Sequence, residues 1–539
     1  MNHRPSLALL AFLTAATAAL AAPTTNDLFS RTVSNGWGST PQAQAYTVSG
    51  GTASDFSTNG SRGQIKLSTV NNRLARLGTS FTNFETTVRL ALSAVPTANY
   101  AYAGPSVRIQ SSGTDFYHAR LRHNSSGSVT LTIQKIISGS QTNLSTEVTV
   151  GTGYTAGSYY RLRFSAAGTN PTYLRAKAWK DADPEPALWQ AEITDSTSIL
   201  QAAGGAGVRA GGHSSFTPLN TSYYVDDFQV HDVAYVSNLK TAMQNAVAGD
   251  ILYFTGTHTG NMKTSAHGTA AAPIIVRGIN ATVQTASQAT GYGVDVRHDY
   301  WRFDDFTINY AMKGFYCLNA DHGVATRIDI TNIGQEAFKF RRYTNYWEIV
   351  ACSVDGTGQT AGDYGEGFYV GDAQSNWESS TTPDTSGNIT FRDCHTVNTA
   401  NDGYDVKEGA HHVKFIDCIA DFSGIEPVGG HARGDSGFYL RGDNLQLIGC
   451  LVHDLGNGST AYNVANLSAN GTDYGNAIEF KAVTAQNITN GGAMFEIQST
   501  RSDGVVIYTD YTATNVANFK IGSGSYTSGN PASFVELTW

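Results

Sequence analysis

A short phrase of alternating polarity recurs through the second half of the chain. Each copy reads small, aromatic or aliphatic, polar, aliphatic, polar, which is the pattern of a β-strand with one buried and one solvent-facing side. The copies are Gly314-Phe315-Tyr316-Cys317-Leu318, Ala337-Phe338-Lys339-Phe340-Arg341, Gly367-Phe368-Tyr369-Val370-Gly371, Gly403-Tyr404-Asp405-Val406-Lys407, Gly437-Phe438-Tyr439-Leu440-Arg441 and Ala477-Ile478-Glu479-Phe480-Lys481. Irregular repeats of this length predict the coils of a parallel β-helix with loops inserted between its strands. We place this domain at residues 234–539.

The polar positions of successive coils are expected to stack into exposed columns. One predicted column holds Tyr316, Lys339, Tyr369, Asp405, Tyr439 and Glu479, and a second holds Arg341, Gly371, Lys407, Arg441 and Lys481. Because neighbouring strands lie roughly 5 Å apart, side chains in one column are near neighbours. This face is where we expect function.

Residues 24–233 carry a different pattern, with alternating strands separated by Gly, Ser and Asn turns. Examples are Glu85–Leu90, Val129–Ile133 and Tyr160–Phe164. This pattern predicts an antiparallel β-sandwich, so the fold class is all-β. Between the two domains, Val236–Ala248 is predicted to form an amphipathic helix with Leu239, Ala242 and Val247 on one side, covering the open end of the first coil.

Composition narrows the classes of function. The chain has 539 residues, 15% of them charged, and a formal net charge of −9, which disfavours nucleic acid and anionic membranes as partners. Residues 1–21 read as a signal peptide, with His3 and Arg4 before an apolar run and Ala19-Leu20-Ala21 as a cleavage site. We therefore expect a secreted protein without membrane insertion, since no later stretch is long enough to span a bilayer. The sequence does not indicate an oligomeric state.

Five cysteines in an exported chain would ordinarily suggest disulfides. Here Cys352, Cys394, Cys418 and Cys450 occupy the same place in four successive repeats. Equivalent positions in a β-helix stack on one another. We therefore predict buried free thiols that pack as small hydrophobic groups.

Oxygen ligands gather on two adjacent coils of the repeat. Glu366 and Asp402 share the turn position before the aromatic residue, and Asn401 and Asp405 belong to the second of these coils. Stacked carboxylates repel unless a cation or a proton intervenes. Calcium takes many hard oxygen ligands with tolerant geometry, so these four residues are the predicted Ca²⁺ site.

Two cations are expected beside this cluster. Lys407 follows Asp405 by two residues and so lies on the same face, and Arg441 lies one coil further on. Calcium, lysine and arginine together suit β-elimination of a uronic-acid polymer, because the proton to be removed is α to a carboxylate whose charge must be neutralised. A lysine near a cation is expected to have its pKa lowered toward neutrality, which suits a base.

Two coils resemble known enzyme families. Asn401-Asp402-Gly403-Tyr404-Asp405 resembles the Asp-Asp-Gly-aromatic-Asp calcium motif of the family-nine pectate lyases, with Asn401 in place of the first Asp. Gly434–Leu440 resembles the strand that carries that family's catalytic lysine, but Tyr439 stands in its place. The resemblance implies a right-handed parallel β-helix of the pectate lyase-like kind.

The family-six lyases, which include alginate lyases and chondroitinase B, offer a second resemblance. Their base is a lysine shortly after acidic calcium ligands, assisted by an arginine on the next coil, and Lys407 and Leu440-Arg441-Gly442 match those places. This resemblance implies Lys407 as the base and Arg441 as a carboxylate clamp or proton donor, with Tyr439 as the rival for either role. Residues 24–233 in turn resemble concanavalin-like jelly-roll modules attached to secreted carbohydrate enzymes, either as a carbohydrate-binding domain or as a spacer.

The remaining positions of the polar face are candidates for substrate binding: Tyr369, Lys339, Arg341, Lys481 and Trp377. Trp377 belongs to a long insertion, Asp372–Ser386, which with Gly424–Arg433 is expected to wall a cleft.

Three functions remain open from the sequence. They are a calcium-dependent lyase of an anionic, uronate-containing polysaccharide, an inverting glycoside hydrolase that uses paired carboxylates such as Asp402 and Asp405, and a non-catalytic glycan-binding or adhesin protein. In the last case, Asp405, Lys407 and Arg441 would form only a solvated ladder of ion pairs.

Overall fold

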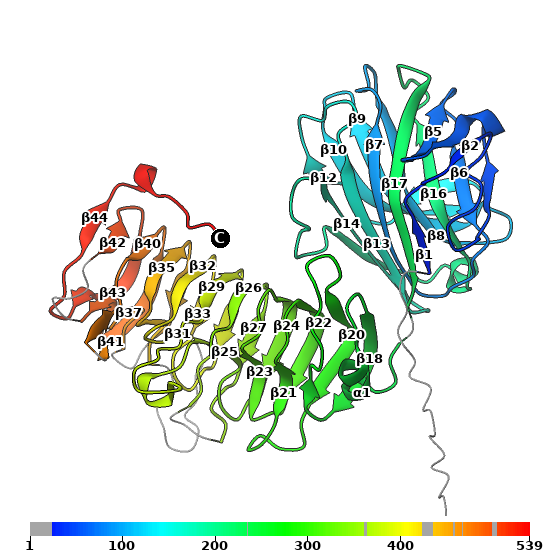
Figure 1. Cartoon of the computed structure of the whole chain (residues 1–539). Helices are drawn as coiled ribbons and strands as arrows, with labels where there is room; N and C mark the ends of the chain where they lie inside the picture. The colour runs from blue at the N-terminus through cyan, green and yellow to red at the C-terminus, as the bar shows by residue number, and fades with distance from the viewer. Residues whose placement is uncertain are drawn as a thin grey trace, which may run out of the picture.

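The computed structural model describes residues 24–233, 235–360, 364–422, 435–455, 459–465, 467–469, 471–498 and 504–539. Within these ranges the chain forms an antiparallel β-sandwich followed by a long stack of parallel strands, which confirms the predicted all-β fold class (Figure 1). The predicted signal peptide, boundary residue 234 and loop 424–433 lie outside the described residues.

The sandwich consists of two antiparallel sheets packed around an apolar core. The order of the first sheet is β15 (Ala191–Asp195), β14 (Thr172–Lys180), β13 (Tyr160–Ala167), β7 (Phe84–Leu92), β17 (Thr221–Asp232), β5 (Gly63–Leu67), β4 (Phe56–Asn59) and β2 (Thr32–Ser34), with β1 (Thr25–Asp27) on β17. The order of the second is β11 (Ser140–Asn143), β10 (Val129–Ile137), β9 (Phe116–Asn124), β8 (Tyr100–Ile109), β16 (Gly205–Gly212), β6 (Arg73–Leu77) and β3 (Tyr46–Ser49), with β12 (Val148–Gly151) on β10. The three strands predicted from alternation lie within β7, β10 and β13.

The second domain is a parallel β-helix whose coils contribute to three stacked sheets. The first sheet holds β18 (Ile251–Thr259), β20 (Ile274–Gln284), β22 (Trp301–Asn309), β24 (Val324–Thr331), β26 (Asn345–Val350), β29 (Gly387–Arg392), β32 (His411–Ile416), β35 (Asp443–Ile448), β40 (Ile478–Lys481), β42 (Val505–Tyr508) and β44 (Thr527–Gly529). The second holds β19 (Met262–Lys263), β21 (Tyr292–Val296), β23 (Lys313–Leu318), β25 (Phe338–Arg341), β28 (Phe368–Val370), β31 (Tyr404–Val406), β34 (Phe438–Leu440) and β37 (Tyr462–Val464). The third holds β27 (Ser353–Asp355), β30 (His395–Val397), β33 (Ile419–Asp421), β36 (Leu451–His453), β41 (Thr484–Ile497) and β43 (Thr512–Ile521).

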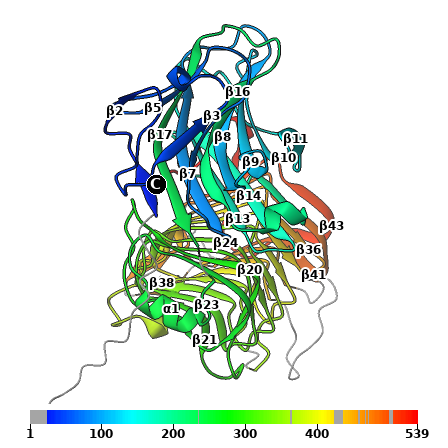
Figure 2. The same cartoon turned by 90° about the vertical axis from the view of Figure 1, so that its right-hand side faces the viewer.

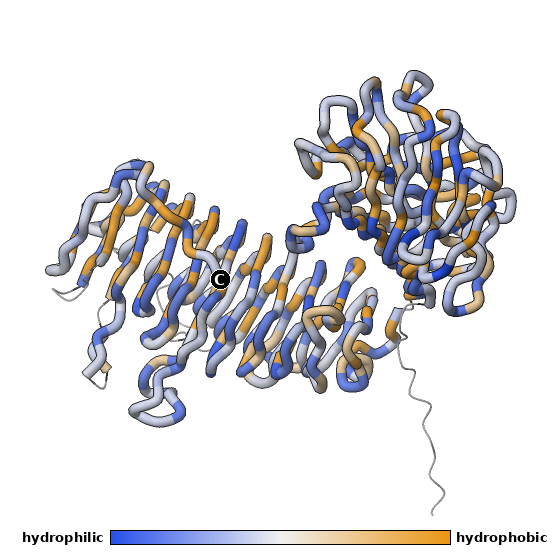
Figure 3. The backbone as a smooth tube through the Cα atoms, turned by 45° about the horizontal axis from the view of Figure 1, so that its top comes forward, coloured by the Kyte–Doolittle hydropathy of each residue, from blue (hydrophilic) through white to orange (hydrophobic). Residues whose placement is uncertain are grey.

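Like residues stack inside the coils. The rings of Phe338, Phe368, Tyr404, Phe438 and Tyr462 follow one another face to face, with centroids 4.4–5.4 Å apart. This order follows from the sequence, because every copy of the repeat has its ring at the same inward position. Figure 3 shows the resulting alternation of hydrophobic and hydrophilic positions along the coils.

The cysteines behave as predicted. Cys352, Cys394, Cys418 and Cys450 are buried and free, as is Cys317. The first four point their sulfur atoms at backbone carbonyls; the Cys394 thiol, for example, donates to Ile349 O at 3.5 Å. The ladder is therefore a packing feature of the core.

Helix α1 (Leu239–Asn245) covers the first coil, as expected, but it is shorter than predicted. Leu239 and Met243 are its buried residues, whereas Val247 is 54% exposed, so the predicted apolar side was wrong at that position. Asn238 caps the helix by accepting a hydrogen bond from Thr241 N at 3.0 Å, which sets the helix start one turn later than hydropathy indicates. In Figure 2, α1 faces the viewer and the sandwich lies above the β-helix.

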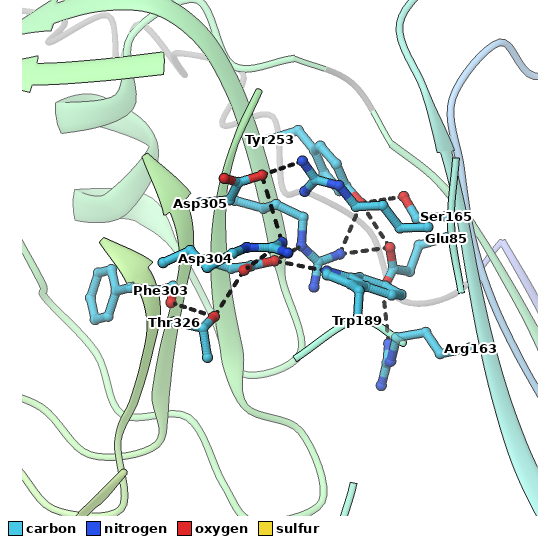
Figure 4. Close-up of polar contacts among 12 residues, drawn as sticks. Glu85, Arg163, Ser165, Trp189, Tyr253, Phe303, Asp304, Asp305 and Thr326 are labelled. Carbon is cyan, nitrogen blue, oxygen red and sulfur yellow. Dashed lines mark hydrogen bonds and ion pairs between the residues drawn. The ribbon is translucent and has the colours of Figure 1, made fainter. Parts of the chain in front are cut away.

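The two domains share a buried polar interface. Arg277 of β20 donates to Glu85 of β7 at 2.8 Å and to Asp304 of β22 at 2.9 Å, and Tyr253 of β18 also donates to Glu85 at 2.7 Å (Figure 4). Trp189 donates its indole N–H to Asp304 at 3.1 Å. Because all these groups are buried and paired, the sandwich lies in a defined position on the first sheet.

Short 3₁₀ turns complete the structure: η1 (Ala53–Asp55), η2 (Ser198–Gln201), η3 (Gln374–Asn376) and η4 (Pro531–Ser533), and a hairpin of β38 (Leu467–Ala469) and β39 (Thr472–Tyr474) projects from a loop. In the described part of the chain, every helix is too short or too polar to cross a bilayer.

Candidate active site

The second sheet stacks most of the predicted polar column. Its register pairs Tyr316 with Lys339, Lys339 with Tyr369, Tyr369 with Asp405, and Asp405 with Tyr439. The neighbouring positions also follow the prediction, since Lys407 N donates to Val370 O and Arg441 N to Val406 O at 2.8 Å each. Asp405, Tyr439, Lys407 and Arg441 therefore lie on two adjacent coils of one sheet.

The last copy of the repeat was assigned wrongly. Tyr439 pairs with Asn463 of β37, whereas Glu479 and Lys481 belong to β40 and pair with Gln446 and Ile448 of the first sheet. Lys481 is bound there to Asp510 at 3.0 Å, so it does not join the candidate substrate-binding residues. The true strand, Ala461-Tyr462-Asn463-Val464, has the same small-ring-polar-aliphatic order, and that pattern was the signal available to find it.

Three carboxylates come together next to this column. Glu366, Asp402 and Asp405 each place an oxygen so that the three atoms lie within 4.8 Å of one another, and all three side chains are buried. Asp402 accepts a hydrogen bond from Ser436 N at 2.9 Å, and Glu366 accepts one from Gly365 N at 3.1 Å. Asn401 is held by its backbone: its N–H donates to Gly365 O at 3.2 Å, and its carbonyl accepts from the Thr399 hydroxyl at 3.0 Å.

The acids of this cluster perturb one another. Burial, and then the charge of Asp405, raises the pKa of Asp402 well above its ordinary value. The same two causes raise the pKa of Glu366. Buried like charges at this separation are unfavourable unless a cation or a proton compensates them. The donor set of hard oxygens fits Ca²⁺.

Two cations converge on the third acid of the cluster. Lys407 Nζ contacts Asp405 Oδ2, and Arg441 Nη2 lies 3.4 Å from Asp405 Oδ1. Asp405 itself is fully buried, whereas the side chains of Lys407 and Arg441 expose 10% and 13% of their surface. The cations therefore form the outer layer of the cluster, although they lie deeper than the open trough we expected.

The protonation state of Lys407 differs from the expectation. Burial is the largest single influence and lowers the pKa of this amine, but the charge of Asp405, the charge of Glu366 and the hydrogen bond to Asp405 together raise it, and the net shift is upward. The expected pKa near neutrality is therefore wrong for this arrangement, because the contact with Asp405 had not been included. The raised pKa favours the protonated form of Lys407 as long as the amine stays in contact with Asp405.

Aromatic rings lie under these cations. The Tyr369 ring carries Lys407 Nζ at 4.6 Å and Lys339 Nζ at 4.0 Å from its centroid, and Arg441 lies 4.6 Å from the centre of the Tyr439 ring. Burial is the main cause that raises the pKa of the Tyr439 hydroxyl. Tyr439 thus stays protonated and next to the arginine.

Other predicted substrate-binding residues have local partners. Lys339 binds Glu336 at 2.6 Å, and Arg341 binds Asp372 at 2.8 Å. The expectation for Trp377 was wrong: its ring is buried against Tyr474 and its indole N–H donates to Asp372 O at 2.9 Å. The insertion that carries Trp377 is fastened to a later loop, and this ring is not available as a platform for a sugar.

Glu408 belongs to this site but was not predicted from the sequence. This buried carboxylate lies 3.4 Å from Arg441 Nη1 and accepts a hydrogen bond from Gln374 N, so it pairs with a different nitrogen of the arginine from the one that faces Asp405. Strand alternation would have pointed Glu408 inward from Lys407. The strand ends at Val406, however, and the chain turns at Gly409, where φ is +94°. Gly409 was the available signal for that turn.

The chain is similar to several solved structures of lyases at low sequence identity. No family model matches the sequence, and no curated protein matches it. Among solved structures, the chain is similar to an alginate lyase from Paenibacillus sp. FPU-7 at 23% identity, covering 54% of this chain and 95% of that one, with a TM-score of 0.46. A rhamnogalacturonan lyase (14% identity, 54% and 82% covered, TM-score 0.40) and pectate lyase Pel9A (16% identity, 55% and 77% covered, TM-score 0.35) are also similar. The structural neighbours thus include the two kinds of lyase named from the motifs.

Proposed function

We propose that this protein is a secreted, calcium-dependent lyase that cleaves a uronate-containing polysaccharide by β-elimination. The observation that carries the proposal is the convergence of Lys407 and Arg441 on Asp405, directly beside Glu366 and Asp402. A structural ladder of ion pairs would balance its charges, whereas here three carboxylates share one buried position. Such imbalance is typical of a site completed by a ligand.

The roles follow from what β-elimination requires. The lone pair of a neutral Lys407 amine takes the proton α to the substrate carboxylate. A carbon–carbon double bond forms as the glycosidic C–O bond at the β carbon breaks, and its electrons leave with the sugar oxygen. Arg441 pairs with the substrate carboxylate and stabilises the charge that develops on it. Tyr439, protonated and beside Arg441, donates a proton to the departing oxygen and is the rival candidate for the base.

Glu366, Asp402, Asp405 and Asn401 are the residues that would hold Ca²⁺. When bound, the ion would supply positive charge that offsets the negative charge of a nearby carboxylate, so the adjacent proton would be lost more easily. The chain's own contribution to this step comes from the ion pair between Lys407 and Asp405. Any partner that takes over the charge of Asp405 removes the main cause that raises the Lys407 pKa. The amine is then free to lose its proton and act as a base.

The inverting hydrolase is disfavoured by distance. Inverting glycosidases hold their two carboxyl groups about 6.5–9.5 Å apart to admit a water molecule. Oxygens of Asp402 and Asp405 lie within 4.8 Å of each other, and a lysine contacts the second acid. A non-catalytic glycan-binding protein remains the alternative, and the same assay distinguishes it.

The test is the appearance of the unsaturated product. The protein is incubated with pectate, alginate, glucuronan and chondroitin, each with calcium and with a chelator, and ultraviolet absorbance and reducing ends are followed. Absorbance that depends on calcium is the expected result. Reducing ends without absorbance would indicate a hydrolase, and neither signal would indicate a binding protein.

A variant assigns the base. Lys407→Ala is expected to lower kcat by at least about 10²-fold, because general base catalysis contributes about that much or more. Lys339→Ala is the matched control, since Lys339 also lies over Tyr369 but pairs with Glu336. Circular dichroism checks that both variants are folded. Full activity in Lys407→Ala would transfer the role of base to Tyr439.

A further inference from the structure

The first sheet has an open stretch between two coverings. The sandwich covers its beginning through Arg277 and Asp304, and the C-terminal segment covers its later strands. There Lys414 binds Glu536 at 2.9 Å, and Gln446 donates to Val535 O and accepts from Leu537 N at 2.8 Å each. Figure 1 shows this segment running back over β40 and β35 toward the sandwich. The strands between, β26 and β29, lie on the floor of a cavity of about 710 Å³.

Aromatic rings line one side of this cavity. Tyr300, His322 and Tyr346 stack at equivalent turns of three successive coils, with centroids 4.7 and 4.8 Å apart and planes within 8° of parallel. Tyr346 ends the stack, and 44% of its surface is exposed. Trp539 is 41% exposed and lies two coils further along, with Lys414 Nζ 4.4 Å from its ring centre. Two accessible rings thus flank the floor, which is formed by Thr390 and Arg392.

The backbone at these turns is unfavourable for two of the three rings. Tyr300 and Tyr346 have φ of +59° and +58°, a left-handed conformation that tyrosine disfavours and that histidine and asparagine adopt more readily. The next coils place Asn388, His412 and Asn444 at the same turn. Tyrosine at two turns that line the cavity, where these other coils have asparagine or histidine, points to a use for the two rings.

The charges of the lining favour an anion. The cavity lining contains three basic side chains, Arg302, Arg392 and Lys414, and one acidic side chain, Glu348. Arg302 is 3.4 Å from Glu185 and Lys414 is paired with Glu536. Among the residues that the structure describes, Arg392 makes no side-chain hydrogen bond or ion pair, and neither does Glu348. A guanidinium that lines the cavity without such a partner is suited to bind a carboxylate.

The cavity continues toward the sandwich. A second cavity of about 400 Å³ shares Ala270, Pro273 and Arg302 with the first and is lined on its other side by Arg161 and Trp179 of the sandwich. The two together form an elongated groove that crosses from one domain to the other. An elongated groove with flanking rings fits a chain-like ligand better than a compact one.

We propose that this groove is a second carbohydrate site, which binds a segment of an acidic polysaccharide on the sheet that does not carry the candidate active site. Tyr346 and Trp539 provide stacking surfaces for sugar rings, and Arg392 binds a uronate carboxylate. The acidic class of the ligand agrees with the proposed function and rests on it in part. The groove holds the polymer to the enzyme while the other sheet acts on it.

Isothermal titration of the full-length chain tests this site. The probes are hexamers of galacturonate, of mannuronate and guluronate, and of glucuronate, with cellohexaose as the neutral comparison and a chelator present to prevent turnover. At least one uronate hexamer is expected to bind. Tyr346→Ala and Trp539→Ala are each expected to weaken that binding about tenfold, and Arg392→Ala is expected to weaken it about tenfold as well.

The control is Tyr310→Ala, which removes a tyrosine that is 45% exposed and has a left-handed backbone but lies outside the cavity lining. Its affinity should equal that of the wild type. Unchanged affinity in both Tyr346→Ala and Trp539→Ala, absence of binding, or equal binding of cellohexaose would overturn the proposal.

The lyase assay separates the two proposals. Cleavage of short oligomers should be unchanged in Tyr346→Ala. If the lyase assay shows absorbance while the ring variants bind the hexamers as tightly as the wild type, only the groove proposal is refuted. If binding depends on the rings but the lyase assay shows no absorbance, only the lyase proposal is refuted.

Discussion

The effect of Asp402 on the stability of the fold should change from unfavourable to favourable when a cation binds. Its pKa is raised, first by burial and then by Asp405, so the folded chain holds a proton there more tightly than the unfolded chain does. This raised pKa favours folding at low pH, and that advantage is lost as the pH rises through the folded value. At neutral pH, without calcium, this buried acid should therefore destabilise the fold.

We therefore expect Asp402→Asn to unfold at a higher temperature than the wild type in a chelator at pH 7. Once calcium is added, the order should reverse, and the variant should unfold at a lower temperature than the wild type. The amide oxygen can still accept the hydrogen bond from Ser436 N. Differential scanning fluorimetry at several calcium concentrations measures both effects. Asp443→Asn is the control, because burial also raises the pKa of Asp443 but the residue lies outside the cluster. An identical calcium response in Asp402→Asn and the wild type would contradict the assignment.

Sequence reasoning worked at residues whose neighbours follow from the repeat. Glu366, Asp402, Asp405, Lys407 and Arg441 were predicted to lie together, and they do, because their positions depend only on strand phase and on one coil succeeding another. It failed where one contact decides the outcome. The raised pKa of Lys407 follows from its direct contact with Asp405, which spacing alone does not specify.

At the scale of the element, the repeat predicted strands well and sheet membership less well. Ala477–Lys481 has the small-aliphatic-polar-aromatic order of the second sheet, yet β40 lies on the first sheet. All three sheets of a β-helix turn one face inward, so alternation alone does not distinguish them. Length of the intervening loops decides the assignment, and those loops vary from coil to coil.

The cysteine ladder gives a prediction at this scale. Burial raises the pKa of Cys317, Cys394, Cys418 and Cys450 well above the ordinary thiol value, so none of these side chains should react as a thiolate in the native state. A thiol reagent such as DTNB is expected to modify no cysteine of the folded protein and all five after denaturation. Rapid reaction of a native cysteine, or fewer than five thiols on unfolding, would contradict the ladder.

At the scale of the whole molecule, the contact between domains was beyond the reach of sequence patterns. Glu85 reads as an ordinary polar position of an alternating strand, and its partner Arg277 lies 192 residues further along the chain. Alternation shows which side of a strand faces outward, but it does not show which outward side another domain will cover. The groove between the domains was unpredicted for the same reason.

Arg277 is the residue on which this contact depends. Removing it leaves Glu85 and Asp304 buried with fewer partners, and breaking one member of a buried ion pair costs about 3–5 kcal/mol. We expect Arg277→Ala to lower the unfolding free energy by about that amount, measured by urea denaturation. In calorimetry, the sandwich and the β-helix should then unfold at separate temperatures. Lys481→Ala is the control, because Lys481 pairs with Asp510 within its own domain, with 25% and 28% of the two side chains exposed, and its loss should cost at most about 1 kcal/mol. Equal losses in the two variants would mean that the domains do not stabilise one another, and the groove between them would then lack a fixed shape.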